Sequence, residues 1–75
     1  MYEIDEVYLR IGQNIKKYRE LRGLTQQQLA DKIGMGINFV GKVEVAFSRP
    51  SIPTLVKIAN ALEISLMDLF NFNIN

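Results

Sequence analysis

The sequence of 75 residues contains no cysteine and no histidine, and both absences narrow the chemistry that the chain can carry out. A zinc finger, a thiolate site and a histidine-activated nucleophile all need one of these side chains. A glycine-rich phosphate loop is also missing, because Gly34-Met35-Gly36 is too short to form one. We therefore expect neither an enzyme nor a protein that binds a metal or a cofactor.

Long hydrophobic runs and a basic N-terminus are absent as well. No stretch approaches the length of a membrane span, and the first six residues carry three acids instead of the basic start of a secretory signal. The length fits one domain, near the lower limit for folding without metals or disulfides. The sequence thus predicts a single domain over residues 1–75 that works in the cytoplasm, with no membrane partner and no small-molecule ligand.

The charges are unevenly distributed along the chain. The formal net charge is only +1, but from residue 7 onward nine Lys and Arg residues face five acids, which leaves a balance of +4. Such an excess favours contact with nucleic-acid phosphates, although an ordinary solvated surface has the same composition. Charge therefore supports nucleic-acid binding without deciding it.

Residues 25–45 show the pattern of two short helices joined by a tight turn. Thr25 is a good N-cap, and Gln28 three residues later can complete a capping box. Gly34 ends the first of these helices, since glycine adopts a positive φ most readily. The second helix is predicted over about residues 37–45.

The side chains of this pair have the sizes that a steep crossing of two helices needs. Ala30 is small where the second helix would cross the first, and Val40 and Val43 can fill the angle between them. The outer side of the second helix is expected to present four residues, which we call the reading face: Ile37, Asn38, Gly41 and Lys42. This is the layout of a helix-turn-helix.

Three further helices complete an all-α fold. The apolar spacing from Tyr2 onward predicts a first helix that opens within the leader, residues 1–10, and stops at Gly23, with Arg22 solvated near its end. Ser51 and Ser65 are N-caps for a fourth and a fifth helix.

Both ends of the chain carry apolar residues whose partners the sequence leaves open. Tyr2, Ile4 and Tyr8 form a stripe that either completes the monomer core or contacts a second subunit. The tail, residues 71–75, alternates apolar and polar residues and fits a frayed end, a core cover or a dimer strand. Phe47 either enters the core or stays exposed against a partner.

In order and spacing, these features resemble the Cro/CI phage-repressor (XRE-type) helix-turn-helix family over residues 11–70. The resemblance implies a five-helix, lambda-repressor-like domain that reads double-stranded DNA with its second and third helices. The matching residues are Ile11, Gly12, Ile15, Arg19, Leu24, Thr25, Gln26, Leu29, Ala30, Gly34, Val40, Val43, Glu44, Pro50, Ser51, Leu55, Ile58, Ala59, Ala61, Leu62, Ser65 and Leu69.

The resemblance also implies a structural ion pair. In the family, an arginine at the place of Arg19 reaches under the helix that carries the reading face and contacts a glutamate, which is Glu44 here. A guanidinium can hold a carboxylate through two hydrogen bonds and so fix how the reading helix lies on the first helix. We expect this pair to be largely buried.

Four residues are candidates for contact with DNA phosphates. Gln26 matches the family's glutamine that reaches the DNA backbone, and Gln27 opens the same helix, where N–H groups and the positive end of the dipole face outward. Ser48 and Arg49 lie in the loop that follows the phosphate backbone in the family.

The reading face departs from the polar surface that is usual in the family. Asn38 can pair with an adenine edge, Lys42 with guanine or a phosphate, and Ile37 with a thymine methyl group. Gly41 inside a helix indicates a close approach, either to DNA or to a packed side chain. At the helix end, Ala46 stands where relatives usually have glycine.

The pattern predicts a sequence-specific transcriptional regulator that binds a palindromic operator as a homodimer, and the resemblance to the family implies that the copies pair through the C-terminal helix and tail. A few base contacts, each worth roughly 1–3 kcal/mol of discrimination, are too few for one subunit to select an operator. The alternative is a protein-interaction module on the same scaffold, with weak or lost DNA readout. Small and apolar residues on and beside the reading face support that alternative.

Overall fold

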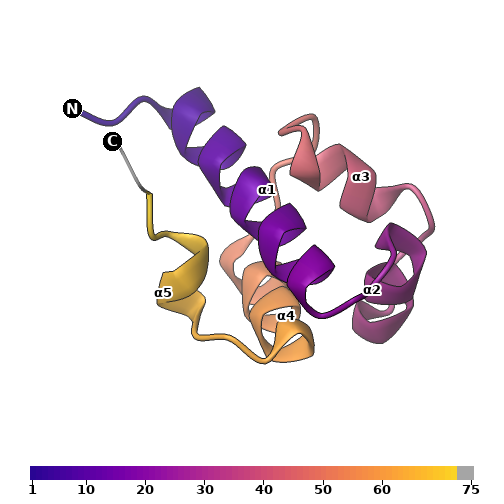
Figure 1. Ribbon diagram of the computed structural model, residues 1–75. Coiled ribbons are helices and arrows are strands. Elements are labelled where there is room, and N and C mark those ends of the chain that lie inside the picture. The colour runs from indigo at the N-terminus through magenta and orange to yellow at the C-terminus, as the bar shows by residue number, and fades with distance from the viewer. Residues whose placement is uncertain (73–75) are drawn as a thin grey trace.

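The computed structural model describes residues 1–72, and this part of the chain is all-helical (Figure 1). The five helices are α1 (Ile4–Leu21), α2 (Gln26–Ile33), α3 (Phe39–Glu44), α4 (Ile52–Leu62) and α5 (Leu66–Leu69). The longest helix, α1, runs through the middle of the molecule, with α2 and α3 towards one end and α5 on the other side. The predicted five-helix fold is confirmed.

Side-chain caps begin α2, α4 and α5 at the predicted residues. The Thr25 hydroxyl accepts a hydrogen bond from the Gln28 N–H over 3.0 Å, and the Gln28 side chain accepts one from the Thr25 N–H over 2.8 Å. Ser65 opens α5 with the same capping box, and Ser51 caps α4. Because these bonds satisfy backbone donors that a helix start leaves free, the capping residues set where these three helices begin.

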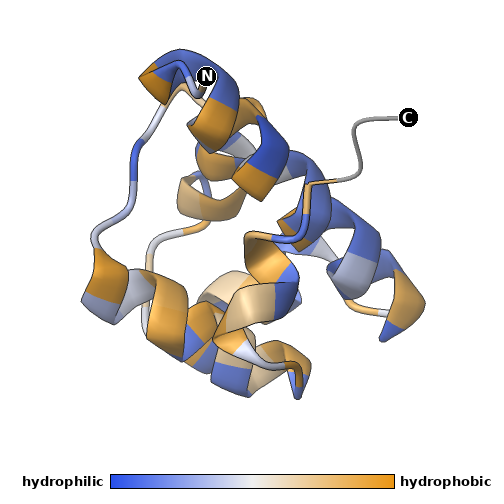
Figure 2. Cartoon of the chain, turned by 90° about the vertical axis from the view of Figure 1, so that its left-hand side faces the viewer, coloured by the Kyte–Doolittle hydropathy of each residue, from blue (hydrophilic) through white to orange (hydrophobic). Residues whose placement is uncertain are grey.

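The apolar faces of the helices meet in one core. Each helix carries hydrophobic and hydrophilic residues in alternating bands (Figure 2), and full burial of a Val, Leu or Ile side chain stabilises the fold by about 1.5–3 kcal/mol. The buried apolar side chains are Ile11, Ile15, Leu29, Ala30, Ile33, Val40, Val43, Leu55, Ile58, Ala59, Leu62 and Leu69.

Gly12 allows α1 to approach the C-terminal end of α3. A Cβ atom added to Gly12 would lie 2.5 Å from the carbonyl oxygen of Val43 and 2.6 Å from that of Glu44. Both neighbours are backbone atoms, which cannot move aside as the end of a side chain can. The position of α3 on α1 therefore depends on the missing side chain at residue 12.

Two polar side chains, one in α1 and one at its C-terminal end, donate hydrogen bonds to the C-terminal carbonyls of other helices. Arg22 donates to the carbonyl oxygens of Leu62 over 2.7 Å and Glu63 over 3.1 Å at the end of α4. Asn14 donates to the carbonyl oxygen of Leu69 over 2.9 Å at the end of α5. Arg22 is exposed, as expected, and its guanidinium also caps the carbonyls that a helix end leaves free.

The three residues of the N-terminal stripe, Tyr2, Ile4 and Tyr8, differ in their burial. The helix begins at Ile4, which is 61% exposed, and Tyr2 precedes it and is 80% exposed. Tyr8 is half-buried against the core, and its hydroxyl donates to the carbonyl oxygen of Pro50 over 3.4 Å. The prediction that the stripe completes the monomer core is thus confirmed for Tyr8 and wrong for Tyr2 and Ile4. Of the tail, only residues 71 and 72 lie within the described residues, and Phe72 packs against the core.

Candidate nucleic-acid interface

The reading face lies partly ahead of α3. The helix begins at Phe39 and not near residue 37 as predicted, so Ile37 and Asn38 belong to the turn that leads into it. Asn38 occupies the N-cap position in αR conformation, and its side chain makes no capping hydrogen bond. Ile37 is 61% exposed, and Asn38 and Lys42 are exposed as well. These side chains are therefore accessible at the start and along the outer side of α3.

A buried ion pair fixes α3 on α1, as predicted. The Nε and Nη2 atoms of Arg19 donate to the two carboxylate oxygens of Glu44 over 2.6 and 3.2 Å. Nη1 of Arg19 donates to the carbonyl oxygen of Leu24 over 2.8 Å, where the chain enters the turn before α2. The hydrogen bond to Glu44, supported by the negative charges of Glu44 and Glu20, raises the pKa of Arg19 above its ordinary value, although burial acts in the opposite direction. One guanidinium thus joins α1, α3 and the approach to α2.

Gln26 extends this network from α2 to α3. Its Nε2 donates to Oε1 of Glu44 over 3.0 Å, and its amide lies against Gly41. A Cβ atom on Gly41 would be 3.2 Å from Oε1 of Gln26. Of the two explanations for a glycine inside α3, a packed side chain is thus present at residue 41. Sequence reasoning placed Gln26 at the DNA backbone but missed its bond to Glu44.

The other phosphate candidates differ in their accessibility. Gln27 is exposed in the first turn of α2. Ser48 is half-buried, and its N–H donates to the carbonyl oxygen of Lys42 over 3.1 Å. Arg49 forms an exposed ion pair with Asp5 and lies 5.5 Å above the ring centre of Tyr8. The N-terminal turn of α1 therefore already supplies an acid to the loop arginine.

The chain leaves α3 in a conformation that usually requires glycine. Ala46 has φ 62°, and the N–H groups of Phe47 and Ser48 both donate to the carbonyl oxygen of Lys42. Phe47 is 77% exposed, with the Lys42 ammonium 5.9 Å above its ring centre. The core alternative for Phe47 was wrong, because the turn at Ala46 directs this ring outward beside the reading face.

Within residues 1–72, no three acids, cysteines or histidines gather closely enough to hold a metal ion. No helix of this described part is long and apolar enough to cross a membrane.

Comparison with known proteins identifies this arrangement. The helix-turn-helix family profile matches residues 15–69, which include α2, the turn and α3. The chain belongs to the XRE-type helix-turn-helix family. The similar proteins are transcriptional regulators and not enzymes. One of them is the CTXphi repressor RstR of Vibrio cholerae, which is 38% identical to this chain over 61 residues. That alignment covers 81% of this chain and 54% of RstR.

Solved structures of the family share the fold. The restriction-modification controller C.AhdI of Aeromonas hydrophila is 33% identical, with a TM-score of 0.80, over 84% of this chain and 96% of C.AhdI. The biofilm regulator SinR in complex with DNA is 34% identical, with a TM-score of 0.75, over 81% of this chain and 98% of that chain. The chain spans about half the length of the first curated relatives that it matches, at 50% and 54% of them.

Proposed function

We propose that this protein is a sequence-specific transcriptional regulator that works in the cytoplasm by binding double-stranded DNA. The observation that carries the proposal is the joint placement of α2 and α3. The Arg19–Glu44 pair holds α3 on α1, Gln26 at the start of α2 bonds to Glu44 of α3, and Asn38 and Lys42 remain exposed. A helix-turn-helix of this kind places its second helix in the major groove. The DNA complex of the related SinR supports the same partner for this chain.

The reading face supplies a small set of base contacts. The Asn38 amide matches the donor and acceptor of an adenine edge, and the Lys42 ammonium can donate to guanine or to a phosphate. Ile37 offers an apolar contact for a thymine methyl group. Since only the first two are polar, each subunit reads few base pairs.

The phosphate contacts come from both sides of α3. Gln26 and Gln27 lie at the start of α2, where free N–H groups and the helix dipole favour an anion. Ser48 and Arg49 follow α3 in the loop. The exposed ion pair of Arg49 with Asp5 is worth at most about 1 kcal/mol, so a phosphate can replace the carboxylate.

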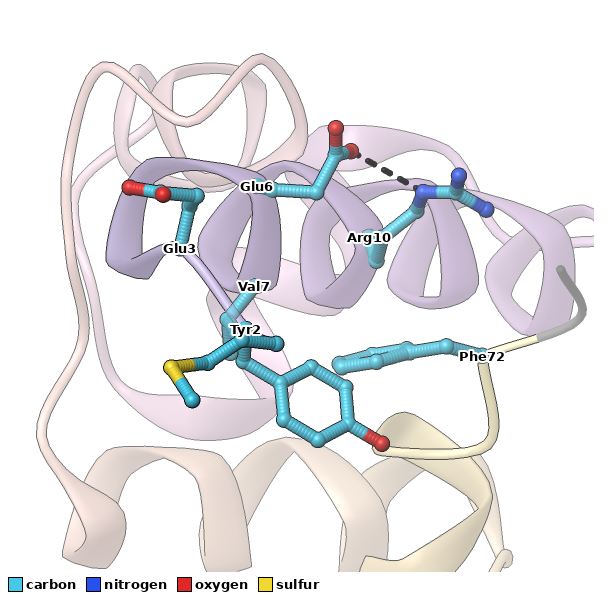
Figure 3. A pocket seen from close by; sticks show the side chains of 7 residues that line it. Tyr2, Glu3, Glu6, Val7, Arg10 and Phe72 are labelled. Atoms are coloured by element: carbon cyan, nitrogen blue, oxygen red, sulfur yellow. Dashed lines mark hydrogen bonds and ion pairs between the residues drawn. The ribbon is translucent and has the colours of Figure 1, made fainter.

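A homodimer supplies the readout that one subunit lacks. Two copies related by a two-fold axis, with α3 helices about 34 Å apart, would read a palindromic operator. Around α5, on the side away from α2, Met67 is 78% exposed and Phe70 37% exposed. Beside Phe70, a pocket of about 510 Å³ combines apolar and charged side chains: it is lined by Met1, Tyr2, Val7 and Phe72 and by Glu3, Glu6 and Arg10 (Figure 3). This apolar end supports pairing through the C-terminal helix and tail.

Salt dependence tests the proposal directly. The protein is titrated onto a fluorescent DNA duplex at several salt concentrations, and the dissociation constant is plotted against salt on logarithmic axes. Phosphate contacts predict a slope of about 0.9 per neutralised phosphate, because binding releases counterions. Binding that is absent, or that does not change with salt, would contradict the proposal.

A protein-interaction module is the second candidate, and one observation favours it. Val45, Phe47 and Ile37 form exposed apolar surface around α3, at 69%, 77% and 61% exposure. Apolar contact with a protein partner would be weakened little by salt. If the duplex titration fails, a Phe47→Ser variant that loses a protein partner would support this second function.

A further inference from the structure

The amide of Gln26 lies between two residues of α3. Its Nε2 donates to Oε1 of Glu44 over 3.0 Å, and its Oε1 lies 3.2 Å from the place that a Cβ atom on Gly41 would take. Because a carboxylate offers only acceptors, Glu44 determines which end of the amide turns towards it. The hydrogen bond to Glu44 therefore orients the side chain, and the absence of a Cβ atom at residue 41 leaves room for it.

We infer that Gly41 and Glu44 are positioning residues for Gln26, which they hold in place for a DNA phosphate. This inference rests on the proposed function. Nε2 carries two hydrogens, of which Glu44 accepts one, so one remains for a phosphate oxygen. A side chain ordered before binding loses less conformational freedom on the DNA.

Glu44 can hold the amide because it is itself immobile. It is only 6% exposed, and Arg19 binds both of its oxygens. The Oε1 atom accepts from Arg19 over 3.2 Å and from Gln26 over 3.0 Å, so the same carboxylate serves the ion pair and the amide. The position of Gln26 is thus coupled to the position of α3 on α1.

Gly41 has a second possible role, in which its backbone approaches a DNA base directly. This role and the positioning of Gln26 predict different effects of a substitution at residue 41. A Cβ atom at residue 41 would lie 3.2, 3.5 and 3.6 Å from Oε1, Nε2 and Cδ of Gln26. These atoms belong to the end of a flexible side chain, which can swing away without moving the backbone. Gly41→Ala should therefore leave the fold intact and displace the amide.

The test uses Gly41→Ala in the full chain, with two readouts. Alanine is the better helix former, but the displaced amide loses its bond to Glu44, so the melting temperature should rise by less than the roughly 4–8 °C that helix propensity alone would give a domain of this size. In contrast, affinity for a DNA duplex should fall by about tenfold or more, as when a hydrogen bond to a charged group is lost. The loss should be equal for a selected and an unrelated duplex, with an unchanged salt slope, because Gln26 carries no charge.

A double-mutant cycle separates positioning from direct contact. If Gly41 acts through Gln26, then Gly41→Ala should cause no further loss of affinity in a Gln26→Ala background. Additive losses, or a changed base preference, would overturn the inference in favour of backbone contact with a base. Asn60→Ala on the exposed side of α4 is the matched control, since it also favours the helix but should leave DNA affinity unchanged.

Nuclear magnetic resonance of the free protein adds a readout that needs no DNA. The side-chain NH₂ signals of Gln26 should differ from those of a solvated glutamine, and Gly41→Ala should return them to solvated values. Solvated signals in the wild type would overturn the inference even if DNA binds normally. Displaced signals without binding to any duplex would instead overturn the proposed function and, with it, the role at a phosphate.

Discussion

Arg19 and Glu44 are 25 residues apart in the sequence, yet the guanidinium of one donates to both carboxylate oxygens of the other, over 2.6 and 3.2 Å. Both side chains are buried, so each depends on the other for compensation of its charge. Since Glu44 ends α3 and Arg19 belongs to α1, this pair fixes how α3 and its reading face lie relative to α1 and the core.

Arg19→Ala should lower the free energy of unfolding by about 3–5 kcal/mol, because it leaves a buried carboxylate without a partner. Chemical denaturation of wild type and variant measures this difference. The raised pKa of Arg19 means that its charged form is fully present below the ordinary arginine value. The loss should therefore be the same at neutral and moderately alkaline pH. An unchanged denaturation midpoint would show that the pair is solvated in solution.

Gly12→Ala should destabilise the protein by about 1–3 kcal/mol, the usual cost of an added methyl group in a packed site. The new Cβ would meet the carbonyl oxygens of Val43 and Glu44 at 2.5 and 2.6 Å, which forces α1 and α3 apart. The denaturation midpoint and the duplex affinity should both decline. Gly36→Ala is the stability control, because no atom lies within 4 Å of the place that its new methyl group would take.

Ala46→Gly should raise the free energy of unfolding by about 1 kcal/mol, because a residue with a Cβ is strained at positive φ. Ala46 has φ 62°, and its N–H donates to the carbonyl oxygen of Val43 over 3.0 Å. Glu63 ends α4 with φ 58°, so Glu63→Gly should show a comparable gain. A lower melting temperature for both variants would mean that these turns differ in solution.

Asn38→Ala should reduce affinity for the selected operator while it leaves stability within about 0.5 kcal/mol of wild type. The side chain makes no capping bond and is exposed, so its removal costs the fold little. Loss of one base contact predicts a decrease of about 1–3 kcal/mol in specific binding free energy. Binding to an unrelated duplex should stay the same, and equal operator affinity would remove Asn38 from the reading face.

Local chemistry made much of the fold predictable. The capping box at Thr25 and the N-caps at Ser51 and Ser65 form as expected, because an N-cap and its bonding partner act within one turn. The buried apolar residues follow helical spacing, and this spacing predicts which side of a helix faces the core. Family resemblance, and not spacing, predicted the Arg19–Glu44 pair, since its residues are remote in sequence.

The parts that could not be predicted depend on contacts between distant segments. The Gln26–Glu44 bond requires the crossing of α2 and α3, and a glycine at residue 41 was its only visible signal. The direction of Phe47 follows from the turn at Ala46, which a sequence without glycine there does not reveal. The late start of α3 concerns its terminal residues, where sequence patterns are weakest.

Selection of bound duplexes from a random DNA pool, with purified protein at low and moderate salt, tests the central claim most directly. The proposed function predicts a palindrome whose half-sites lie about ten base pairs apart, because two α3 helices would enter successive major grooves. The enriched bases would then show what Ile37, Asn38 and Lys42 contact. Recovery of no preferred sequence at either salt concentration would contradict sequence-specific regulation by this protein.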